Sequence, residues 1–497
     1  MRALVAVDLG AQSGRVALGG FDGRRLSVEE VHRFPNVPVR LHGTLHWDVL
    51  RLYADVLDGL RAASGRTAVD SVAVDSWGVD FGLVDRAGRL LGNPVHYRDA
   101  RRAAAVDRVL EQVSPRELYL RTGIQLMPIN TIFELAAMAG EPDPALGSAE
   151  GLMMIPDLFH YWLSGSRTTE FTNATTTQCR DVQAGGWATD LLDRLGVPTR
   201  LLPEIVAPAT PLGRVLDDVA ADAGLGSATV VVAGASHDTA AAVAAVPLRG
   251  DGSAFLSVGT WSLVGVESAE PLVGDASYAA NITNEGGVAG TWRLLRNVTG
   301  LWLVDECRRT WALGGRDYGH RELLSLAESA PPLHSFVDPN DAAFLEPGDM
   351  PAKISAYCAR SGQEAPDDVG AVVRCVLESL ALKHAETVAL ISRVTGRELD
   401  ELYVVGGGAN NELLCAWTAE ASDRPVLAGP GEATVVGNML VQAIALGELA
   451  SLADARDVVR DSFSQVIYEP RGSEAWREAR ERFAVLSGTR HEAEVSA

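Results

Sequence analysis

The sequence predicts an α/β protein with two similar domains that face each other across a cleft, and three observations lead to this prediction. In the first half, short β-rich runs alternate with helical patterns, as in proteins that pack helices on a sheet. Near 247–252 (PLRGDG) the chain restarts after a stretch rich in Pro and Gly. A strand, a small polar turn with glycine and another strand then repeat the plan of the N-terminus, although two unrelated hairpins would give the same short pattern.

The expected elements follow from apolar, β-branched runs bounded by turn residues and from helical periodicity. Strands are predicted at 4–7, 15–18, 71–75, 82–84, 229–233, 254–257, 262–266 and 402–405. Helices are predicted at 48–62, 99–112, 132–139 and 369–395. We expect an N-terminal domain at 1–247, a C-terminal domain at 248–488 and a polar, frayed tail at 489–497.

Composition restricts the class of protein. The chain has 497 residues, 47% of them hydrophobic and 22% charged, as in globular proteins with a substantial core. A net charge of −22 argues against a nucleic acid or an anionic membrane as partner, since both attract basic surfaces. Asp8 interrupts the first apolar run, so no secretory signal pattern is present. We therefore expect a cytoplasmic enzyme that is a monomer or a small homo-oligomer.

The cysteines and lysines exclude several kinds of site. The cysteines are not spaced as zinc ligands, and Cys358 and Cys375 are expected to be free thiols, although they are near enough in sequence to meet. The lysines of the chain are Lys353 and Lys383, and neither lies in a P-loop motif. If the protein binds ATP, then backbone amides, hydroxyls and a metal ion have to hold the phosphates.

The segment VDLGAQSGR, at 7–15, is the most informative short stretch of the chain. An apolar run leads Asp8 into a glycine-containing turn, and a second apolar run leads away, which predicts a hairpin. Backbone amides at a hairpin tip can bind phosphate oxygens, and a neighbouring carboxylate can hold Mg²⁺ or its water shell. An ordinary tight turn has the same local pattern, so other segments have to decide between the two interpretations.

Further segments carry polar residues at the ends of apolar runs. They are VDSWGVD at 74–80, SHDTAAAV at 236–243, SVGTWSLVGVE at 257–267 and GGGANNELL at 406–414. With the first hairpin, they resemble the FGGY family of sugar kinases, within the actin-like ATPase fold. The resemblance to the rhamnulokinase group of that family extends through YRDARR at 97–102, TGIQLMPINT at 122–131, EFTNATTTQ at 170–178, NITNEGG at 281–287, LLRNVTGLWL at 294–303, FVDPNDAAFLEPGDM at 336–350 and AGPGEATVVGN at 428–438. This resemblance implies two ribonuclease-H-like domains.

Asp238 is the residue to which the resemblance assigns the catalytic chemistry. It follows the predicted strand 229–233, in the motif Ser-His-Asp-Thr. Phosphoryl transfer to an alcohol needs an acceptor for the hydroxyl proton, in line with the γ-phosphorus. The catalytic base of the family aligns with Asp238, so we expect that role here. Asp238 could also cap an alanine-rich helix that starts at Thr239, and the two roles are compatible.

The resemblance also implies contacts to metal, nucleotide and sugar. Asp8 is expected to organise Mg²⁺, the cofactor that accompanies the co-substrate ATP. The expected ATP contacts lie in the two hairpins and the glycine triplet: Ala11, Gln12, Ser13, Gly14, Arg15, Thr260 and Gly407. The expected sugar contacts are Gly78, His237, Asp238, Thr239 and Asn297.

The implied reaction is the ATP-dependent phosphorylation of L-rhamnulose at its 1-hydroxyl, which gives L-rhamnulose 1-phosphate and ADP in L-rhamnose catabolism. Two alternatives stay open at this point. One is another ketose or polyol kinase of the family, for fuculose, xylulose or glycerol, since sugar specificity can depend on few side chains. The other is a non-catalytic actin-like ATPase. Asp305 stands where the family commonly has Gln near the nucleotide, so we assign it no ATP contact.

Overall fold

The chain, seen here in a computed structural model that describes residues 1–140 and 143–488, divides into two units. Unit 1 comprises residues 1–247, 267–294 and 432–463, and unit 2 comprises residues 248–266, 295–431 and those from 464 onward. The expected single division after residue 247 therefore differs from this one, because two later segments pack with unit 1. The predicted tail at 489–497 lies outside the described residues.

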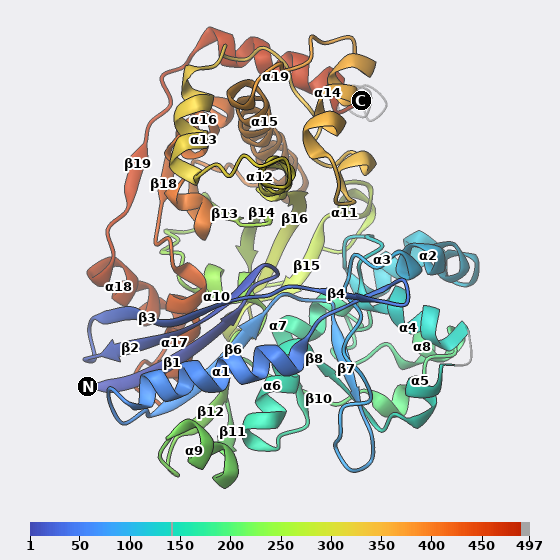
Figure 1. The fold of residues 1–497 in the computed structure, drawn as a ribbon, viewed down its shortest axis with the longest axis vertical. Helices are drawn as coiled ribbons and strands as arrows, with labels where there is room; N and C mark the ends of the chain where they lie inside the picture. The colour runs from blue at the N-terminus through green and yellow to red at the C-terminus, as the bar shows by residue number, and fades with distance from the viewer. Residues whose placement is uncertain (141–142, 489–497) are drawn as a thin grey trace. The chain divides into compact units, whose positions relative to one another are not determined.

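Unit 1 is built on a sheet with the strand order β11-β12-β6-β1-β2-β3 (Figure 1). The strands are β1 (Arg2–Leu9), β2 (Ser13–Phe21), β3 (Leu26–Pro35), β6 (Ser71–Ser76), β11 (Thr210–Arg214) and β12 (Val230–Ala233). Strand β1 pairs antiparallel with β2 and parallel with β6, which in turn pairs parallel with β12. The carboxyl ends of β1, β6 and β12 consequently lie at one edge of the sheet, where α/β proteins commonly bind their ligands.

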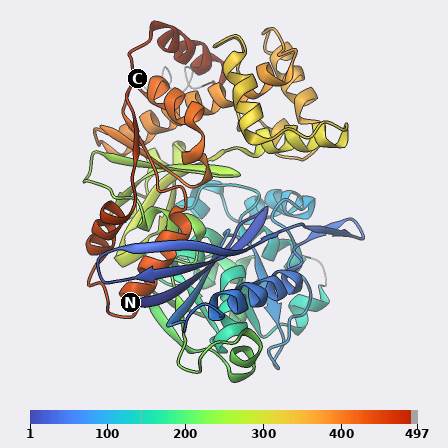
Figure 2. The ribbon, with the colours of Figure 1, turned by 60° about the vertical axis from the view of Figure 1, so that its left-hand side comes forward.

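Helices cover both faces of this sheet. On the face that carries Val16, the helix α1 (Val49–Ser64) approaches so closely that a Cβ at Gly59 would lie 2.3 Å from the Val16 side chain. On the opposite face lies α17 (Ala433–Ala445), which Figure 2 shows in orange-red beside the blue N-terminal strands. Tyr53 of α1 contacts aromatic rings of α6 (Ile155–Ser164), so α1 and α6 are neighbours. Segments far apart in sequence thus enclose one sheet.

A second apolar cluster of unit 1 lies around a short antiparallel strand pair. The pair is β7 (Phe81–Val84) and β8 (Gly151–Met154). Buried side chains from this pair pack with those of α2 (Ala100–Gln112), α3 (Pro115–Thr122) and α4 (Thr131–Gly140). This cluster supports the turn that follows β6, which contains a predicted sugar contact.

Unit 2 is built on strands in the order β16-β14-β13-β17-β18-β19, although residues 267–268 of β14 and 292–294 of β16 are counted with unit 1. Their bounds are β13 (Ser253–Val258), β14 (Trp261–Ser268), β16 (Trp292–Thr299), β17 (Glu401–Val405), β18 (Val426–Ala428) and β19 (Val466–Tyr468). The helices include α12 (Trp302–Leu313), α13 (His320–Ser329), α14 (Met350–Arg360), α15 (Val369–Thr395), α16 (Glu412–Ser422) and α19 (Glu474–Leu486). The buried α15 is the longest element among the described residues.

The two units repeat one strand plan. In unit 1 the hairpin β1–β2 lies between the parallel strand β6 and strand β3. In unit 2 the hairpin β13–β14 lies between the parallel strand β17 and strand β16. The hairpin duplication that the sequence indicated is therefore confirmed, and the predicted α/β class with it.

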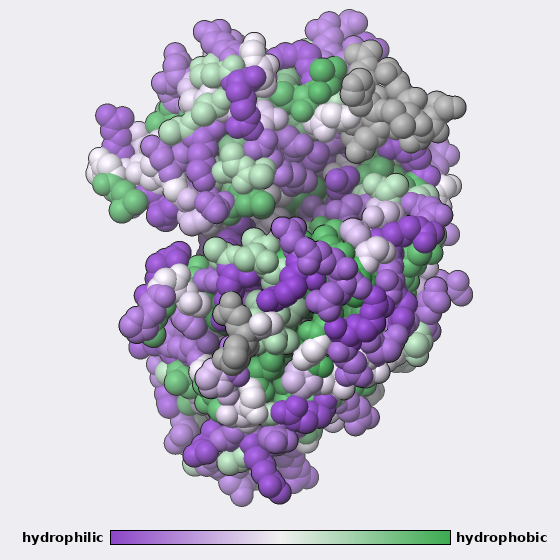
Figure 3. Space-filling view, turned by 90° about the vertical axis from the view of Figure 1, so that its right-hand side faces the viewer, coloured by the Kyte–Doolittle hydropathy of each residue, from purple (hydrophilic) through white to green (hydrophobic). Residues whose placement is uncertain are grey.

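The polarity of the surface and the state of the cysteines agree with what the sequence predicts. Hydrophilic side chains cover most of the face shown in Figure 3, with apolar ones in small groups. All five cysteines, among them Cys358 and Cys375, are buried free thiols. Within residues 1–140 and 143–488, no helix combines the length and the apolar character needed to cross a bilayer.

Buried histidines give this fold an acid-sensitive stability. His384 of α15 is fully buried, and its ring nitrogens have no hydrogen-bond partner among the residues that the structure describes. Burial lowers the pKa of His384 to about 3 and that of His160 to about 4. An unfolded histidine binds a proton below about pH 6.5, so the unfolded state holds more protons at pH 5. The neutral, buried histidines therefore cost the fold no stability above about pH 6.5, and the free energy of unfolding decreases as the pH falls below that value.

We expect His384→Leu to raise the free energy of unfolding more at pH 5 than at pH 8, by a difference of about 2 kcal/mol. Leucine fills the site without a group that must be protonated. Urea denaturation of both proteins at the two pH values measures this difference. His334→Leu, at an exposed histidine, is the control. Equal pH dependence in wild type and His384→Leu would contradict the prediction.

Candidate active site

Three aspartates gather at the carboxyl edge of the unit 1 sheet. Asp8 and Asp75 are the penultimate residues of β1 and β6, and they are register partners in these adjacent parallel strands. The chain beyond β12 runs along β6, since Ser76 N donates to Ser236 O over 2.9 Å, and it then reaches Asp238. Electrostatic interactions link Asp75 to both other carboxylates. The ends of β1 and β6 and the segment that follows β12 thus bring three acids together.

The first hairpin holds its tip with buried polar contacts. Asn36, which the sequence analysis did not single out, donates from Nδ2 to the carbonyl of Gly10 over 2.9 Å, and its backbone N donates to Gln12 O. Arg15 donates from Nε to Oδ2 of Asp8 over 2.8 Å and also pairs with Glu432. Asp8 and Arg15, predicted to contact metal and ATP respectively, are therefore paired with each other here.

Asp75 is fully buried and tied to α17. Asn438 donates from Nδ2 to Oδ2 of Asp75 over 2.5 Å, and Gln442 donates to Oδ1 of Asn438 over 2.7 Å. The other oxygen, Oδ1 of Asp75, has no hydrogen-bond partner within the described part of the chain. Burial, together with the Asp8 carboxylate, raises the pKa of Asp75 well above its ordinary value. Asp75 was not predicted as a site residue, although an apolar run leads directly to it, just as one leads to Asp8.

Asp238 begins the helix α10 (Asp238–Ala244), and His237 is the N-cap residue. The expectation that Asp238 caps a helix starting at Thr239 was therefore wrong, because the helix already includes Asp238. Its carboxylate is 31% exposed. Oδ1 accepts a hydrogen bond from Thr239 Oγ1 over 3.0 Å and lies 3.4 Å from Nε2 of His237. Burial raises the pKa of Asp238, an effect that His237 opposes and the Asp8 carboxylate increases.

Glu170 holds the turn that presents Asp238. It is fully buried, and its carboxylate accepts bonds from Ser236 N over 3.0 Å and from Ser236 Oγ over 2.7 Å. Thr172 also donates to Glu170, and Thr172 Oγ1 accepts from the backbone N of His237 over 3.1 Å. Hydrogen bonds to this buried carboxyl group thus fix the backbone before α10. No local signal within EFTNATTTQ shows this contact, because it joins residues far apart in sequence.

His237 contacts a buried ion pair. Its Nδ1 lies 3.0 Å from Nη2 of Arg293 and 3.3 Å from Oε2 of Glu285. Arg293 is 0% exposed, and its Nε donates to Gly286 O over 2.9 Å. Burial alone would raise the pKa of Glu285, but Arg293 and His237 hold that pKa below its ordinary value. The pair therefore remains ionised beside the imidazole.

Gly78, predicted to contact sugar, lies buried in the turn after β6. A Cβ there would lie 2.8 Å from Oγ1 of Thr176. The next residue, Val79, has a φ of 67° and donates its backbone N to the same Thr176 oxygen over 3.1 Å. Trp77 is buried nearby, and its indole N donates to Asp80 over 2.9 Å. Packing by itself thus requires a glycine at this position.

The predicted nucleotide contacts of unit 2 lie just after strands: Thr260 in the turn after β13, and Gly407 at the start of a short 3-10 helix after β17. Thr260 is half-buried between β13 and β14, and its carbonyl accepts from Gly300 N over 3.1 Å. Gly406 has a φ of 79°, and a Cβ at Gly408 would lie 2.3 Å from the side chain of Val258. Gly407 is exposed, and a Cβ there would meet nothing within 4 Å. Packing therefore explains the outer two glycines of the triplet but not Gly407.

Asn297, the remaining predicted sugar contact, is half-buried on β16 and belongs to unit 2. Asp8, Arg15, Gly78, His237, Asp238 and Thr239 belong to unit 1. Within unit 1, the structure brings Asp8, Asp238, His237 and Thr239 to the same sheet edge.

A divalent cation fits the chemistry of Asp8 and Asp75. Mg²⁺ bound with ATP usually takes one or two protein carboxylates, several waters and phosphate oxygens. The partnerless Oδ1 of buried Asp75, next to Asp8, is a suitable oxygen donor for such an ion or one of its waters. In the described part of the chain, no three or more His, Cys, Asp or Glu residues form a metal centre by themselves.

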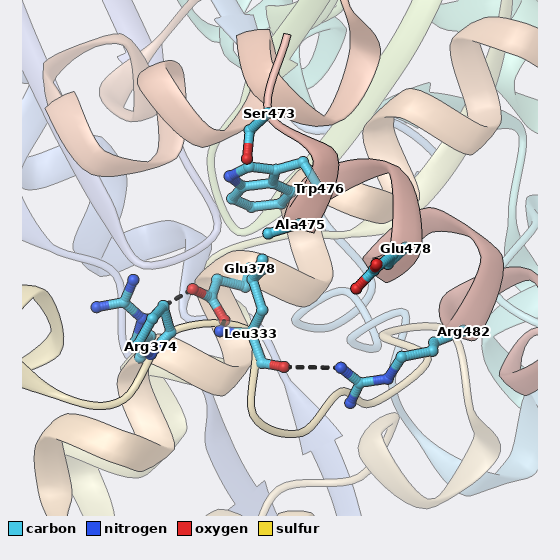
Figure 4. A pocket seen from close by; sticks show the side chains of 9 residues that line it. Leu333, Arg374, Glu378, Ser473, Ala475, Trp476, Glu478 and Arg482 are labelled. Atoms are coloured by element: carbon cyan, nitrogen blue, oxygen red, sulfur yellow. Dashed lines mark hydrogen bonds and ion pairs between the residues drawn. The ribbon is translucent and has the colours of Figure 1, made fainter. Parts of the chain in front are cut away.

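A cavity of about 390 Å³ in unit 2 lies apart from these residues (Figure 4). Three of its charged side chains already have partners: Arg374 donates to Glu378 over 2.7 Å, and Arg482 donates to Leu333 O over 2.9 Å. Trp476 of α19 forms part of the lining. Since no predicted site residue lines this cavity, we assign it no part in the reaction.

Two sequence models of one enzyme family match consecutive parts of the chain. The N-terminal domain of the FGGY family of carbohydrate kinases matches residues 3–245, and the C-terminal domain matches residues 254–446. The chain belongs to the FGGY family of carbohydrate kinases. A rhamnulokinase from Bacteroides thetaiotaomicron is 39% identical to this FGGY kinase over 95% of this chain and 96% of its own. One from Pectobacterium carotovorum is 40% identical over 97% and 96%, respectively.

Solved structures show the same fold. A gluconate kinase from Lactobacillus acidophilus superposes with a TM-score of 0.81 at 16% identity, over 99% of this chain and 98% of that one. A xylulose kinase from the same organism gives 0.80 at 15% identity, over 100% and 99%. The fold is therefore the two-domain, actin-like fold of FGGY kinases. These enzymes use ATP with a divalent metal ion.

Proposed function

We propose that this FGGY kinase transfers the γ-phosphoryl group of MgATP to the 1-hydroxyl of L-rhamnulose, giving L-rhamnulose 1-phosphate and ADP. The observation that carries this proposal is the similarity to rhamnulokinases over nearly the whole length of both chains. The three aspartates at the carboxyl edge of the sheet support it, since they provide a proton acceptor and metal ligands. A cytoplasmic location is part of the proposal.

Asp238 is the proposed proton acceptor. As O1 of the sugar forms its bond to the γ-phosphorus, the bond from phosphorus to the bridging oxygen of ADP breaks, and the O1 proton moves to Asp238. Oδ1 of Asp238 already interacts with Thr239 and His237, so Oδ2 is the oxygen proposed to receive the proton. A half-buried carboxylate with a raised pKa is a stronger base than an exposed one.

Asp8 and Asp75 are the proposed holders of the divalent cation, directly or through water. The cation supplies positive charge that stabilises the phosphoryl group during transfer. Arg15 has its guanidinium beside Asp8, so we propose that it turns to the phosphates when ATP and the cation bind. The backbone of Ala11, Gln12, Ser13 and Gly14 provides amide donors at the hairpin tip.

The remaining contacts are proposed residue by residue from the match to the family motifs. Thr260 offers a hydroxyl to the terminal phosphates, and the open backbone at Gly407 suits the adenine. Gly78 offers backbone groups to the sugar. Asn297 has both a donor and an acceptor, which suits neighbouring sugar hydroxyls.

The test is a coupled assay of ADP release with MgATP and a panel of acceptors. The panel contains L-rhamnulose, L-fuculose, D-xylulose, L-ribulose, glycerol and a sample without sugar, and each is also measured without Mg²⁺. We expect the highest kcat/KM with L-rhamnulose and no turnover without the metal. A higher kcat/KM with another acceptor would overturn the substrate assignment but not the kinase activity. Turnover that no acceptor stimulates would overturn the proposed reaction.

A further inference from the structure

The contacts of His237 determine which of its nitrogens carries the proton. A neutral imidazole donates from one nitrogen and accepts at the other, whereas a guanidinium can only donate. Nη2 of Arg293 makes a 3.0 Å hydrogen bond with Nδ1 of His237. Nδ1 is therefore the acceptor, and the imidazole proton is on Nε2.

Nε2 is the ring nitrogen that lies beside the proposed base. Nε2 of His237 lies 3.4 Å from Oδ1 of Asp238. In this tautomer the contact is between an N–H and a carboxylate oxygen, which attract each other. In the other tautomer Nδ1–H would donate to Glu285, 3.3 Å away, and the Nε2 lone pair would face the Asp238 carboxylate. Arg293, which can only donate, and Glu285, which can only accept when ionised, thus compete for Nδ1.

We propose that Arg293 is a positioning residue for the reaction: by donating to Nδ1 of His237, it keeps the imidazole proton on Nε2, the ring nitrogen that lies beside Oδ1 of Asp238. This inference rests on the proposed role of Asp238 as proton acceptor. Thr239 Oγ1 donates to Oδ1, and the protonated Nε2 of His237 lies 3.4 Å from the same oxygen, so both favour an orientation of the carboxylate that leaves Oδ2 available for the sugar hydroxyl.

Glu285 keeps Arg293 in place. Its Oε2 lies 3.2 Å from Nη2 of Arg293, and Arg293 Nε is bound to Gly286 O. A fully buried guanidinium without an anionic partner would be costly, so Glu285 compensates its charge. Glu285, which lies in the motif NITNEGG, thereby acts on Asp238 through Arg293 and His237. This role needs no contact between Glu285 and the sugar.

The first measurement uses the wild-type protein labelled with [¹⁵N]histidine. Long-range ¹⁵N–¹H correlation spectra distinguish a protonated ring nitrogen from one with a lone pair, and His237→Asn identifies the signals of His237. We expect His237 to be protonated on Nε2 and unprotonated on Nδ1. A proton on Nδ1, in a neutral ring or in an imidazolium, would overturn the proposal without any variant of Arg293 being needed.

The variants then test the link to activity. In Arg293→Met, Nδ1 loses its donor, so we expect the His237 proton to move to Nδ1 and kcat to fall by about 10–100-fold, with smaller changes in KM. Arg293→Lys retains a cationic donor and should restore most of kcat and the Nε2 proton. The control is Arg374→Met, which removes the arginine of the Arg374–Glu378 ion pair in unit 2. It should change neither kcat nor the position of the His237 proton. An unchanged kcat in a folded Arg293→Met protein would overturn the proposal.

The two proposals can fail separately. The tautomer of His237 is measured without turnover, so it does not depend on the identity of the sugar. An Nε2–H tautomer with a fully active Asp238→Asn variant would refute Asp238 as the base, and with it the catalytic role of Arg293. An Nδ1–H tautomer with an inactive Asp238→Asn variant would refute Arg293 alone.

Discussion

Asp238→Asn is expected to lower kcat by about 10²–10⁴-fold, the range for loss of a general base. Asparagine keeps the shape of the side chain and can still accept from Thr239, but it cannot take the hydroxyl proton of the sugar. Coupled ADP-release kinetics with L-rhamnulose measure the change, and KM for the sugar should change much less than kcat. Activity near that of the wild type would refute Asp238 as the proton acceptor.

Stability provides the control for this variant. Since burial raises the pKa of Asp238, its charged form is less favourable in the folded state than in the unfolded one. The folded state therefore loses stability as the pH rises through this pKa, a loss that asparagine avoids. The unfolding temperature of Asp238→Asn at pH 8 should consequently be no lower than that of the wild type. A lower unfolding temperature would mean that unfolding, and not the loss of the base, explains the loss of activity.

Gly437→Ala is expected to destabilise unit 1 by about 3 kcal/mol and to lower kcat as well. A Cβ at Gly437 of α17 would lie 1.8 Å from the carbonyl oxygen of Ala241 in α10. A backbone oxygen cannot turn aside as a flexible side chain can, so the two helices have to separate. Because α10 begins at Asp238, their separation moves the proposed base. Urea denaturation and ADP-release kinetics of the same preparation measure both effects.

The matched control is Gly147→Ala, in the exposed helix α5 (Pro144–Ser148), where a Cβ would meet nothing within 4 Å. That variant should have wild-type activity and wild-type or slightly higher stability, because alanine favours helices. If Gly437→Ala were as stable and as active as Gly147→Ala, the close packing of α10 on α17 would not position Asp238.

Local patterns predicted the elements that have the strongest apolar runs or the longest helical periodicity. The helix expected at 369–395 is α15 with the same bounds, and the strands expected at 71–75 and 254–257 each differ from β6 and β13 by one or two residues. These elements have strong apolar runs or long periodic stretches, which local sequence encodes. The division into units was less predictable, because 432–463 pack with N-terminal strands far away in sequence.

The candidate site was predictable where a motif carries the chemistry. Asp8 and Asp238 each follow an apolar run, and both lie at the carboxyl edge of one sheet. Glu170, Glu285 and Arg293 were not singled out, because their roles depend on partners in other segments. Nothing near Glu170 in sequence indicates that its carboxylate binds Ser236.

By itself the sequence determined the α/β class, the repeated hairpin and the residue types that phosphoryl transfer requires. Periodicity and turn residues act over a few positions, and motifs such as SHDT retain their order whatever the fold. Only the tertiary structure decided that Asp75 lies beside Asp8, that Glu170 binds the turn before α10, and that Arg293 donates to His237. These contacts join distant segments through buried charges and hydrogen bonds, which form only when the chain has folded and excluded water.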